Sequence, residues 1–337
     1  KMADKIADVY ASVAKLINAD ASEIAIVENA TVGWAMAFYA IDFKKGDRIL
    51  TVEAEYASNY LAYLHVAKTK GVIDVVPTGD DGELSLTKLK EMINGDVKLI
   101  SVTHVPTNSG LVNPVSAIGN IARKNNILFL VDACQSAGQI PLDVEEINCD
   151  ILSATSRKYL RGPRGVGFVY VRNSATEVLH PPIIDLHSAL WTSATEYKLR
   201  DDAKRFENWE TNYAAKLGFG AAVDYALDVG IENIHTRVVE LADYLRNKLS
   251  CINNVSMHIL GKQQCGIITF SIEGQNSADI IAKLRQRGIN TSLSSPDSTL
   301  IDATKNNLPD LIRASVHYFN DEDELDFFTN NLKEIII

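Results

Sequence analysis

The residue of this sequence with the clearest chemical potential is a lysine that follows a short apolar run. Lys158 comes soon after Ile151–Thr155 and precedes a turn rich in glycine and proline, beyond which Val166–Val171 is apolar and rich in β-branched residues. Such runs are typical of strands, so Lys158 is expected in a connection between strands, where α/β proteins carry their chemistry. A lysine there is either a solvated surface charge or, when partly desolvated, a nucleophile that forms a Schiff base with an aldehyde.

Hydroxyl groups and a cation beside this lysine suit an anion such as phosphate. Thr155, Ser156 and Arg157 stand immediately before Lys158, and arginine and hydroxyl groups both bind phosphate oxygens. Thr31 follows another strand-like run and opens a helix-like one, where unpaired backbone N–H groups and the helix dipole attract anions. The simpler interpretation of Thr31 alone is an ordinary helix N-cap.

A carboxylate ends the preceding apolar run. Asp132 follows residues 127–131, and Gln135 comes shortly after it. A carboxylate at the end of a buried strand is costly unless it is paired. It either caps the next helix or pairs with a protonated ring nitrogen of a cofactor. Because Asp132 and Lys158 end successive strands, we expect them to face one cleft.

Three further positions have residue types that suit a small charged or aromatic ligand. Tyr56 lies between a strand and a helix, where it either stacks on a flat ring or packs as a half-exposed side chain. Thr103–Gly110 ends another strand with polar groups, among which His104 is expected to be a hydrogen-bonded structural histidine. Arg313 interrupts an apolar run and therefore needs an anion, either a substrate carboxylate or a salt-bridge partner.

Strand-like and helix-like patterns alternate over the first half of the chain. Strands are expected at 23–27, 48–52, 72–77, 98–105, 127–133, 151–155 and 166–171. Helices are expected at 6–17, 33–43, 58–70, 85–93 and 115–124. Nearly continuous apolar strands indicate that helices cover both faces of a largely parallel sheet, so the fold class is α/β. No GxGxxG follows the first strand, which argues against a nicotinamide-binding Rossmann domain.

The pattern changes past about residue 181. Residues 183–212 are irregular and rich in aromatic and charged side chains, as in a lid or an interface. A helical region interrupted at Gly230 then leads into strands and helices expected at 255–260, 266–272, 278–287, 311–316 and 322–332. We therefore expect a large α/β domain at 20–225 and a smaller α+β domain at 226–337, with the N-terminal helix 1–19 grouped with the smaller one.

Composition and charge exclude several classes of protein. The chain has 337 residues, of which 46% are hydrophobic and 23% charged, as in ordinary globular proteins with a substantial core. The net charge of −10 and the lack of a lysine/arginine-rich block argue against a nucleic-acid partner. No apolar run approaches the about 20 residues that span a bilayer. The four cysteines are far apart, which indicates neither a metal site nor a disulfide framework, so a cytoplasmic location is expected.

Taken in order, the candidate residues match a known family. The matching segments are Val131-Asp132-Ala133-Cys134-Gln135, Thr155-Ser156-Arg157-Lys158 with Gly162-Pro163 behind it, and Arg313-Ala314-Ser315. Over nearly its whole length the chain resembles the class V aminotransferase family of fold type I enzymes, which depend on pyridoxal 5'-phosphate (PLP). This family includes cysteine desulfurases, C–S lyases and isopenicillin-epimerase-like proteins. The resemblance implies a large domain with a mostly parallel seven-stranded sheet and a smaller C-terminal domain.

The resemblance also implies a role for each candidate. Lys158 is the Schiff-base lysine and the proton shuttle at the substrate Cα, and Asp132 pairs with the pyridine nitrogen. Gln135 hydrogen-bonds the phenolic oxygen of PLP or the surroundings of the ring. Tyr56 falls where many relatives carry a histidine stacked on the ring. Arg313 falls on the arginine that binds the α-carboxylate of the substrate.

The remaining contacts implied by the resemblance concern the phosphate and a second subunit. Cofactor contacts at the phosphate are implied for Ala30, Thr31, Thr155 and Arg157, the last replacing a more usual histidine. Where relatives carry an asparagine near the cofactor, this chain has Thr107 followed by Asn108, and both are candidates. Family members are typically homodimers with the site at the interface, so Phe206–Asn212 is expected to reach the partner's phosphate.

One departure from the family concerns sulfur chemistry. Cysteine desulfurases keep a mobile nucleophilic cysteine shortly before the position of Arg313, but Thr291–Leu300 contains none, and a persulfide mechanism needs that thiolate. Cys134 is expected to point away from the site, because neighbouring strand residues alternate faces. We therefore expect β-elimination from a sulfur-containing amino acid without a persulfide cysteine. Transamination and epimerisation are the alternatives, and non-catalytic PLP binding is a remote one.

Overall fold

Seven strands form the central sheet, in the order β1-β7-β6-β5-β4-β2-β3. The computed structural model describes residues 2–79 and 81–336. In sheet order the strands are β1 (Ile24–Val27), β7 (Gly167–Val171), β6 (Ile151–Thr155), β5 (Leu128–Asp132), β4 (Val97–Thr103), β2 (Arg48–Val52) and β3 (Val72–Val76). β7 is antiparallel to both of its neighbours, and the other adjacent strands are parallel. The predicted mostly parallel α/β sheet is confirmed, and β1, β2, β4, β5 and β6 all end at one edge of it.

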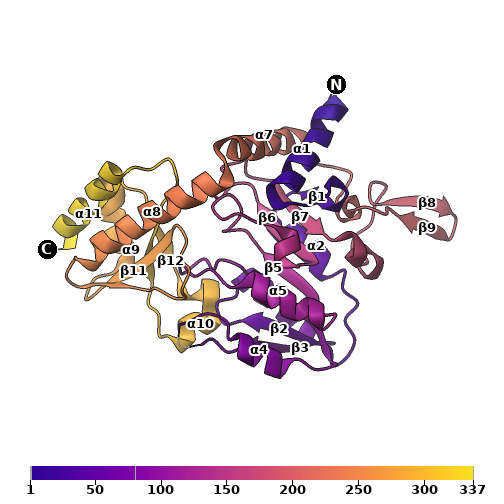
Figure 1. Ribbon diagram of the computed structural model, residues 1–337, viewed down its shortest axis with the longest axis horizontal. Helices are drawn as coiled ribbons and strands as arrows, with labels where there is room; N and C mark the ends of the chain where they lie inside the picture. The colour runs from indigo at the N-terminus through magenta and orange to yellow at the C-terminus, as the bar shows by residue number, and fades with distance from the viewer. Residues whose placement is uncertain (1, 80, 337) are drawn as a thin grey trace.

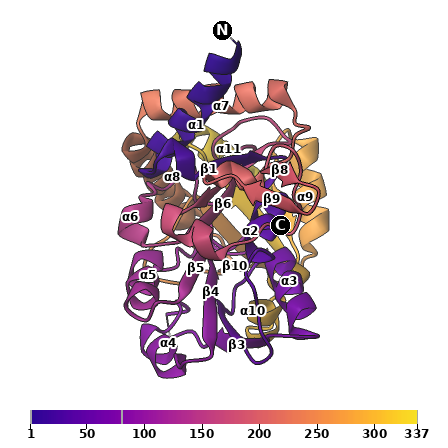
Figure 2. The same cartoon turned by 90° about the vertical axis from the view of Figure 1, so that its right-hand side faces the viewer.

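Helices cover both faces of this sheet, as the continuous apolar strands predicted. On one face, α2 (Ala30–Phe38) and α3 (Ala57–Ala67) bury an aromatic cluster that includes Trp34, Phe38 and Tyr63. On the other face, α5 (Val115–Lys124) and α6 (Val144–Ile147) pack on the sheet around Phe129. Figure 2 shows β4, β5 and β6 between α5 and α6 on one side and α3 on the other. The short α4 (Leu86–Met92) follows β3 near the far edge of the sheet.

The first two helices add details that the sequence pattern did not give. α2 begins at Ala30 rather than near residue 33, because Asn29 caps it by accepting a hydrogen bond from the Val32 N–H. The N-terminal helix α1 (Met2–Ile17) packs on β1 and on α7 (Tyr213–Val229). These contacts lie with the large sheet, and the grouping of residues 1–19 with the smaller domain stays a prediction. The domain limits 20–225 and 226–337 stay a prediction.

A second sheet of four strands forms the other end of the molecule. Its order is β10 (Val255–Met257), β11 (Ile267–Ile272), β13 (Leu311–Ser315) and β12 (Ser292–Ser294), with antiparallel pairing throughout. The helices of this end are α8 (Ile231–Ser250), α9 (Ser277–Gln286), α10 (Leu300–Lys305) and α11 (Glu322–Ile336). Gly230, at φ +88°, separates α7 from α8 as predicted. Figure 1 shows α8 reaching from α7 to this second sheet.

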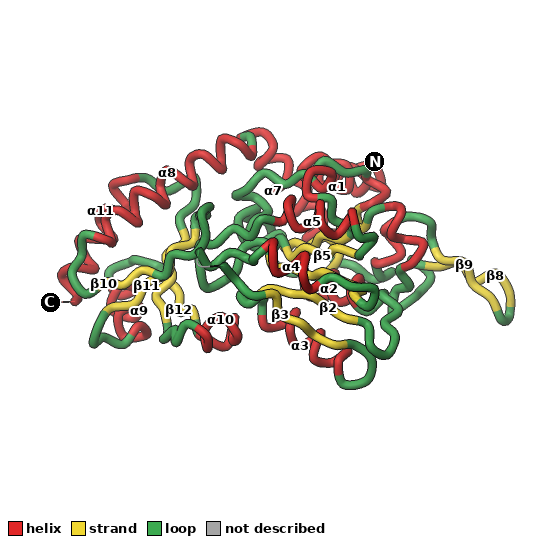
Figure 3. The backbone as a smooth tube through the Cα atoms, turned by 60° about the horizontal axis from the view of Figure 1, so that its bottom comes forward, coloured by secondary structure: helices red, strands yellow, loops and turns green. Residues whose placement is uncertain are grey.

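A hairpin projects where the sequence pattern was irregular. β8 (Ala189–Ser193) pairs antiparallel with β9 (Glu196–Leu199), and Figures 1 and 3 show the pair extending away from the body at the end opposite the C-terminus. The expectation of irregular structure over 183–212 was wrong for these residues. Their side chains are largely exposed on both faces, so no alternation of apolar and polar residues marks the strands. No helix in the part of the chain that the structure describes is long and apolar enough to cross a membrane.

Candidate active site

Most of the predicted site residues line one cavity at the edge of the large sheet where β1, β2, β4, β5 and β6 end. The cavity measures about 210 Å³. Its lining residues are Asn29, Ala30, Thr31, Tyr56, Thr103, Val105, Thr107, Asp132, Cys134, Gln135, Thr155, Arg157 and Lys158. Because parallel strands point their carboxyl ends to the same edge, residues far apart in sequence meet here. Asn29 and Cys134 had not been assigned to the site from the sequence, and Thr103 and Val105 had been considered only as part of the segment 103–110.

Lys158 projects from a closed loop between β6 and β7. The loop is held by hydrogen bonds from the Arg161 N–H to the Lys158 carbonyl oxygen (2.9 Å) and from the Gly162 N–H to the Ser156 carbonyl oxygen (2.8 Å). From the segment that follows β13, the imidazole Nε2 of His317 lies 3.1 Å from the Tyr159 carbonyl oxygen. Lys158 is half-buried and lines the cavity. Its backbone is therefore fixed while its amine can reach a molecule bound there.

Asp132 is a buried carboxylate without a cationic partner. Oδ1 accepts a hydrogen bond from the Cys134 N–H (2.9 Å), and Oδ2 accepts one from Nδ2 of Asn59 (2.9 Å). Among the described residues, no lysine, arginine or histidine lies within salt-bridge distance of it. A carboxylate buried beside a cavity in this state suits a cationic ligand group, such as a protonated ring nitrogen.

Cys134 lines the cavity, so the expectation that it points away was wrong. β5 ends at Asp132, and the alternation of faces that holds within a strand does not extend past its last residue. Burial, together with the negative charge of Asp132, raises the pKa of the Cys134 thiol well above its usual range. The thiol is therefore protonated at neutral pH and is a poor nucleophile.

One end of the cavity forms where α2 begins. Ala30 and Thr31 are the first residues of this helix, whose first N–H groups have no partner within the helix. Gly167 in β7 permits this arrangement, because a Cβ there would lie 3.0 Å from the Ala30 nitrogen and 2.7 Å from a carbonyl oxygen of β6. Thr155 and Arg157 line the same cavity. This set of donors matches the predicted phosphate contacts.

Tyr56 stands at the start of α3 with its backbone tied to a buried carboxylate. Its side chain is 38% exposed and lines the cavity, and its N–H donates to Oε1 of Glu55 (3.0 Å). Burial raises the pKa of Glu55 to about 7, although hydrogen bonds from Thr103 and Asn59 oppose this shift. Glu55 and Asn59 were not singled out from the sequence. The only signal in the sequence was that a carboxylate, Glu55, stands directly before the cavity tyrosine.

Thr107 connects the two ends of the molecule at the rim of the cavity. Its hydroxyl oxygen accepts hydrogen bonds from Nε2 of Gln135 (3.3 Å) and from Nη1 of Arg313 (2.9 Å). Arg313 lies on β13, its Nε is buried without a partner, and burial lowers its pKa. No carboxylate among the described residues pairs with Arg313. This arginine therefore has donors to spare for an anionic ligand near the cavity.

Asn108 and His104 of the 103–110 segment lie outside the cavity lining. Asn108 is buried, and its Nδ2 donates to the Ser295 carbonyl oxygen (2.8 Å) and to Oγ1 of Thr299 (3.1 Å). These contacts use Asn108 to hold the loop before α10 rather than to face the cavity. Burial lowers the pKa of His104 to about 4, so His104 is neutral at physiological pH. Its Nδ1 is buried without a hydrogen-bond partner, so the expectation of a hydrogen-bonded histidine was wrong for this nitrogen.

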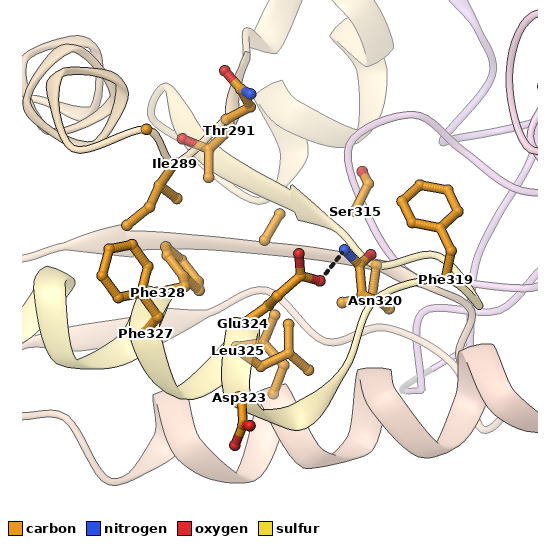
Figure 4. A pocket seen from close by; sticks show the side chains of 15 residues that line it. Ile289, Thr291, Ser315, Phe319, Asn320, Asp323, Glu324, Leu325, Phe327 and Phe328 are labelled. Carbon is orange, nitrogen blue, oxygen red and sulfur yellow. Dashed lines mark hydrogen bonds between the residues drawn. The ribbon is translucent and has the colours of Figure 1, made fainter.

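A larger cavity of about 650 Å³ lies between β13, α8 and α11. Figure 4 shows its wall of Phe327, Phe328 and Leu325, with Glu324 accepting a hydrogen bond from Asn320 (2.9 Å). Its described lining residues include no lysine, arginine or histidine. A lysine, an unpaired buried carboxylate and a helix N-terminus meet only at the smaller cavity among the cavities described here.

The fold and the site together define a class of protein. A mostly parallel seven-stranded sheet, with a lysine, an aspartate and a helix start at its carboxyl edge, is the architecture of fold type I PLP-dependent enzymes. Comparison with known proteins agrees with this class. Residues 1–328 match the family model described as aminotransferase class-V, and the chain belongs to that family. The predicted fold and the predicted enzyme class, PLP-dependent and of the class V aminotransferase fold, are confirmed.

Similar proteins carry names from the sulfur branch of this family. A probable cysteine desulfurase of Synechocystis sp. is 31% identical over 336 residues, covering 96% of this chain and 79% of that protein. The apo structure of a cysteine desulfurase from Thermococcus onnurineus NA1 superposes with a TM-score of 0.92 at 26% identity, covering 99% of this chain and 84% of the other. A complex of the cystine C–S lyase C-DES with cysteine persulfide gives a TM-score of 0.88 at 24% identity, covering 99% and 87%.

Proposed function

We propose that this enzyme binds PLP in the cavity at the carboxyl edge of the large sheet and eliminates the β-substituent of a sulfur-containing amino acid. The amino acid and one water would yield a keto acid such as pyruvate, ammonia and the released thiol. The observation that carries the proposal is the convergence of Lys158, Asp132 and the start of α2 on one cavity. The similar proteins named cysteine desulfurase and cystine C–S lyase support the choice of a sulfur substrate.

The residues around the cavity fit PLP group by group. The start of α2, Thr155 and Arg157 suit the phosphate, and the unpaired carboxylate of Asp132 suits the ring nitrogen. The exposed ring of Tyr56 can cover one face of the cofactor. When bound, PLP supplies an aldehyde carbon that bonds to amino groups and a cationic ring that withdraws electrons from Cα.

The chain's own groups would act as follows. Lys158 would hold the cofactor through its amine and would serve as the base that takes the proton from the substrate Cα. Arg313 binds the substrate carboxylate through donors that have no other anionic partner. Thr107, which also accepts a hydrogen bond from Gln135, orients that arginine. Asn108 has no part in this scheme, because its amide donates to the loop before α10.

The positions of the cysteines favour release of the sulfur group without a persulfide on the enzyme. Cys149 and Cys265 are buried, and burial raises the pKa of Cys265 to about 11. Cys251 is exposed but lies at the end of α8, away from the cavity lining. The high pKa of Cys134 leaves a neutral thiol at the one cysteine beside the site. No described cysteine thus combines access to the cavity with an activated thiolate.

An exposed apolar surface supports a homodimer. Leu186, Leu190 and Trp191 are 73%, 67% and 71% exposed on or beside the projecting hairpin, and Trp209 is exposed in the segment that follows it. A hairpin of this kind, extended away from its own core and carrying large apolar side chains, suits an interface with a second copy of the chain. The expected approach of Phe206–Asn212 to the partner's phosphate belongs to this proposal.

The decisive experiment combines absorbance spectra with product assays on the purified protein. Protein supplied with PLP should show a visible band, and cysteine, cystine and other cysteine derivatives should yield pyruvate together with sulfide, thiol or persulfide. Conversion of the cofactor to its pyridoxamine form with release of a keto acid would instead identify an aminotransferase. Racemised amino acid without a keto acid would identify an epimerase, and a protein that takes up no PLP would overturn the proposal at its base.

A further inference from the structure

A buried carboxylate lies behind the cavity and collects hydrogen bonds from several parts of its wall. Glu55 is 3% exposed. Oε1 accepts from the Tyr56 N–H (3.0 Å), from Nδ2 of Asn59 (2.9 Å) and from the Thr103 hydroxyl. Oε2 accepts from the Thr51 hydroxyl (2.9 Å) and the Thr103 N–H (3.2 Å). A carboxylate that accepts from this many donors is locked in one orientation.

The same network reaches the carboxylate expected to meet the ring nitrogen. Nδ2 of Asn59 has two hydrogens and lies 2.9 Å from Oε1 of Glu55 and 2.9 Å from Oδ2 of Asp132. With both N–H bonds used, the amide holds each carboxylate as an acceptor at a fixed distance. Asn59 is 5% exposed, so water does not compete for these bonds. One donor group thus joins two buried carboxylates.

We propose that Glu55 is a positioning residue that holds Tyr56 directly and Asp132 through Asn59, the two residues expected to contact the ring of the cofactor. It anchors the backbone of Tyr56 on one side and, by way of the Asn59 amide, orients Asp132 on the other. This inference rests on the proposed binding of PLP in the cavity. Neither Glu55 nor Asn59 lines the cavity, so both act through residues that do.

The test compares three single variants and one double variant. Glu55→Gln replaces one carboxylate oxygen by an amide nitrogen, which cannot accept a hydrogen bond. At least one of the surrounding donors then has no acceptor. Asn59→Ala removes the link to Asp132 and keeps the other contacts of Glu55. The matched control is Glu53→Gln. Glu53 is also buried and also follows β2, but it accepts hydrogen bonds from Thr78 and Lys305, away from the cavity.

Two readouts do not depend on turnover. The dissociation constant of PLP should rise about tenfold or more in Glu55→Gln and Asn59→Ala, since each loses a hydrogen bond to a charged group. The visible circular dichroism per bound PLP, which reports how rigidly the ring is held, should fall in both variants and stay unchanged in Glu53→Gln. The double variant should bind PLP about as weakly as the worse single one, because both changes break one link.

The possible outcomes separate this inference from the function on which it rests. If the wild type binds PLP and the single variants match Glu53→Gln in both readouts, Glu55 and Asn59 only support the fold and the inference is wrong. Additive losses in the double variant would also overturn it, because they would show two independent effects. If the wild type itself takes up no PLP, the proposed function fails and the inference falls with it.

Discussion

Arg313 of β13 donates from Nη1 to both the carbonyl oxygen (3.2 Å) and the hydroxyl oxygen (2.9 Å) of Thr107. The contact joins the four-stranded sheet to the loop that follows β4 of the large sheet. It holds the half-buried Arg313 side chain near the cavity rim, while its buried Nε remains without a partner. The alternative was a structural salt bridge, but no carboxylate among the described residues pairs with Arg313. The anion is therefore left to be supplied by a ligand.

Replacement of Arg313 by lysine should impair recognition of the substrate carboxylate. Lysine keeps the charge but loses the planar pair of donors, a change worth about 1.5–3 kcal/mol for a hydrogen bond to a charged group. We expect KM to rise about ten- to hundredfold, with PLP still bound. Arg237→Lys is the control, because Arg237 pairs with Glu322 on the surface. An unchanged KM in Arg313→Lys would assign the arginine to structure alone.

Replacement of Lys158 by alanine should remove both the covalent attachment of PLP and the base at Cα. The absorbance of the wild-type holoenzyme should shift, and kcat should fall at least about 10²- to 10⁴-fold, the usual contribution of general acid–base catalysis. Stopped-flow spectra and product assays measure the two effects. Lys158 lies in a loop that backbone hydrogen bonds hold, so the fold should survive loss of the side chain. Circular dichroism checks this. Full activity in this variant would exclude the mechanism.

The enzyme should carry no persulfide during turnover. Intact-protein mass spectrometry after reaction with cysteine or cystine should find the chain without added sulfur, and peptide mapping should find Cys134 as a free thiol. The reason is its raised pKa, which keeps the thiol protonated near neutral pH. A chain heavier by one sulfur atom, with the addition mapped to Cys134, would show that this cysteine replaces the one missing from Thr291–Leu300 and would revise the proposed route.

Charge placed on the hairpin should dissociate the proposed dimer. Light scattering should give the mass of two chains for the wild type and a shift toward one chain for Trp191→Glu, with association weakened at least about tenfold. Trp191 is suited to the test because it is 71% exposed and lies far from its own core. Phe327→Glu, an exposed aromatic position on α11, is the matched control. A monomeric wild type would refute the interface.

Two buried histidines should make the fold sensitive to acid. Burial lowers the pKa of His104 and of His317 to about 4, whereas both titrate near about 6.5 in the unfolded chain. Between these values the unfolded state binds more protons, so the free energy of unfolding falls as the pH drops from about 6.5 to about 4. This difference in pKa between the folded and the unfolded state corresponds to about 3 kcal/mol of the free energy of unfolding for each histidine. Urea unfolding at several pH values should show that the free energy of unfolding falls less steeply with pH in His317→Gln than in the wild type. An equal slope in both proteins would exclude His317 as a source of the acid sensitivity.

Much of the fold could be predicted from local patterns, and the failures have identifiable causes. The seven strands of the large sheet lie within two residues of their expected limits, because buried parallel strands are continuous apolar runs bounded by turn residues. β12 and the hairpin strands were missed, since short or exposed strands bury too little to leave a pattern. α2 was placed too late, because Asn29 rather than Thr31 caps it.

The sequence by itself determined which chemical groups stand at strand ends. Lys158, Asp132, Tyr56 and Thr31 each follow an apolar run, and parallel strands must bring such residues to one edge. Only the tertiary structure decided which groups touch. The contacts between Asn59 and Asp132 and between Arg313 and Thr107 span 73 and 206 residues. They depend on strand register and on how the two sheets pack, and local periodicity carries no information about either.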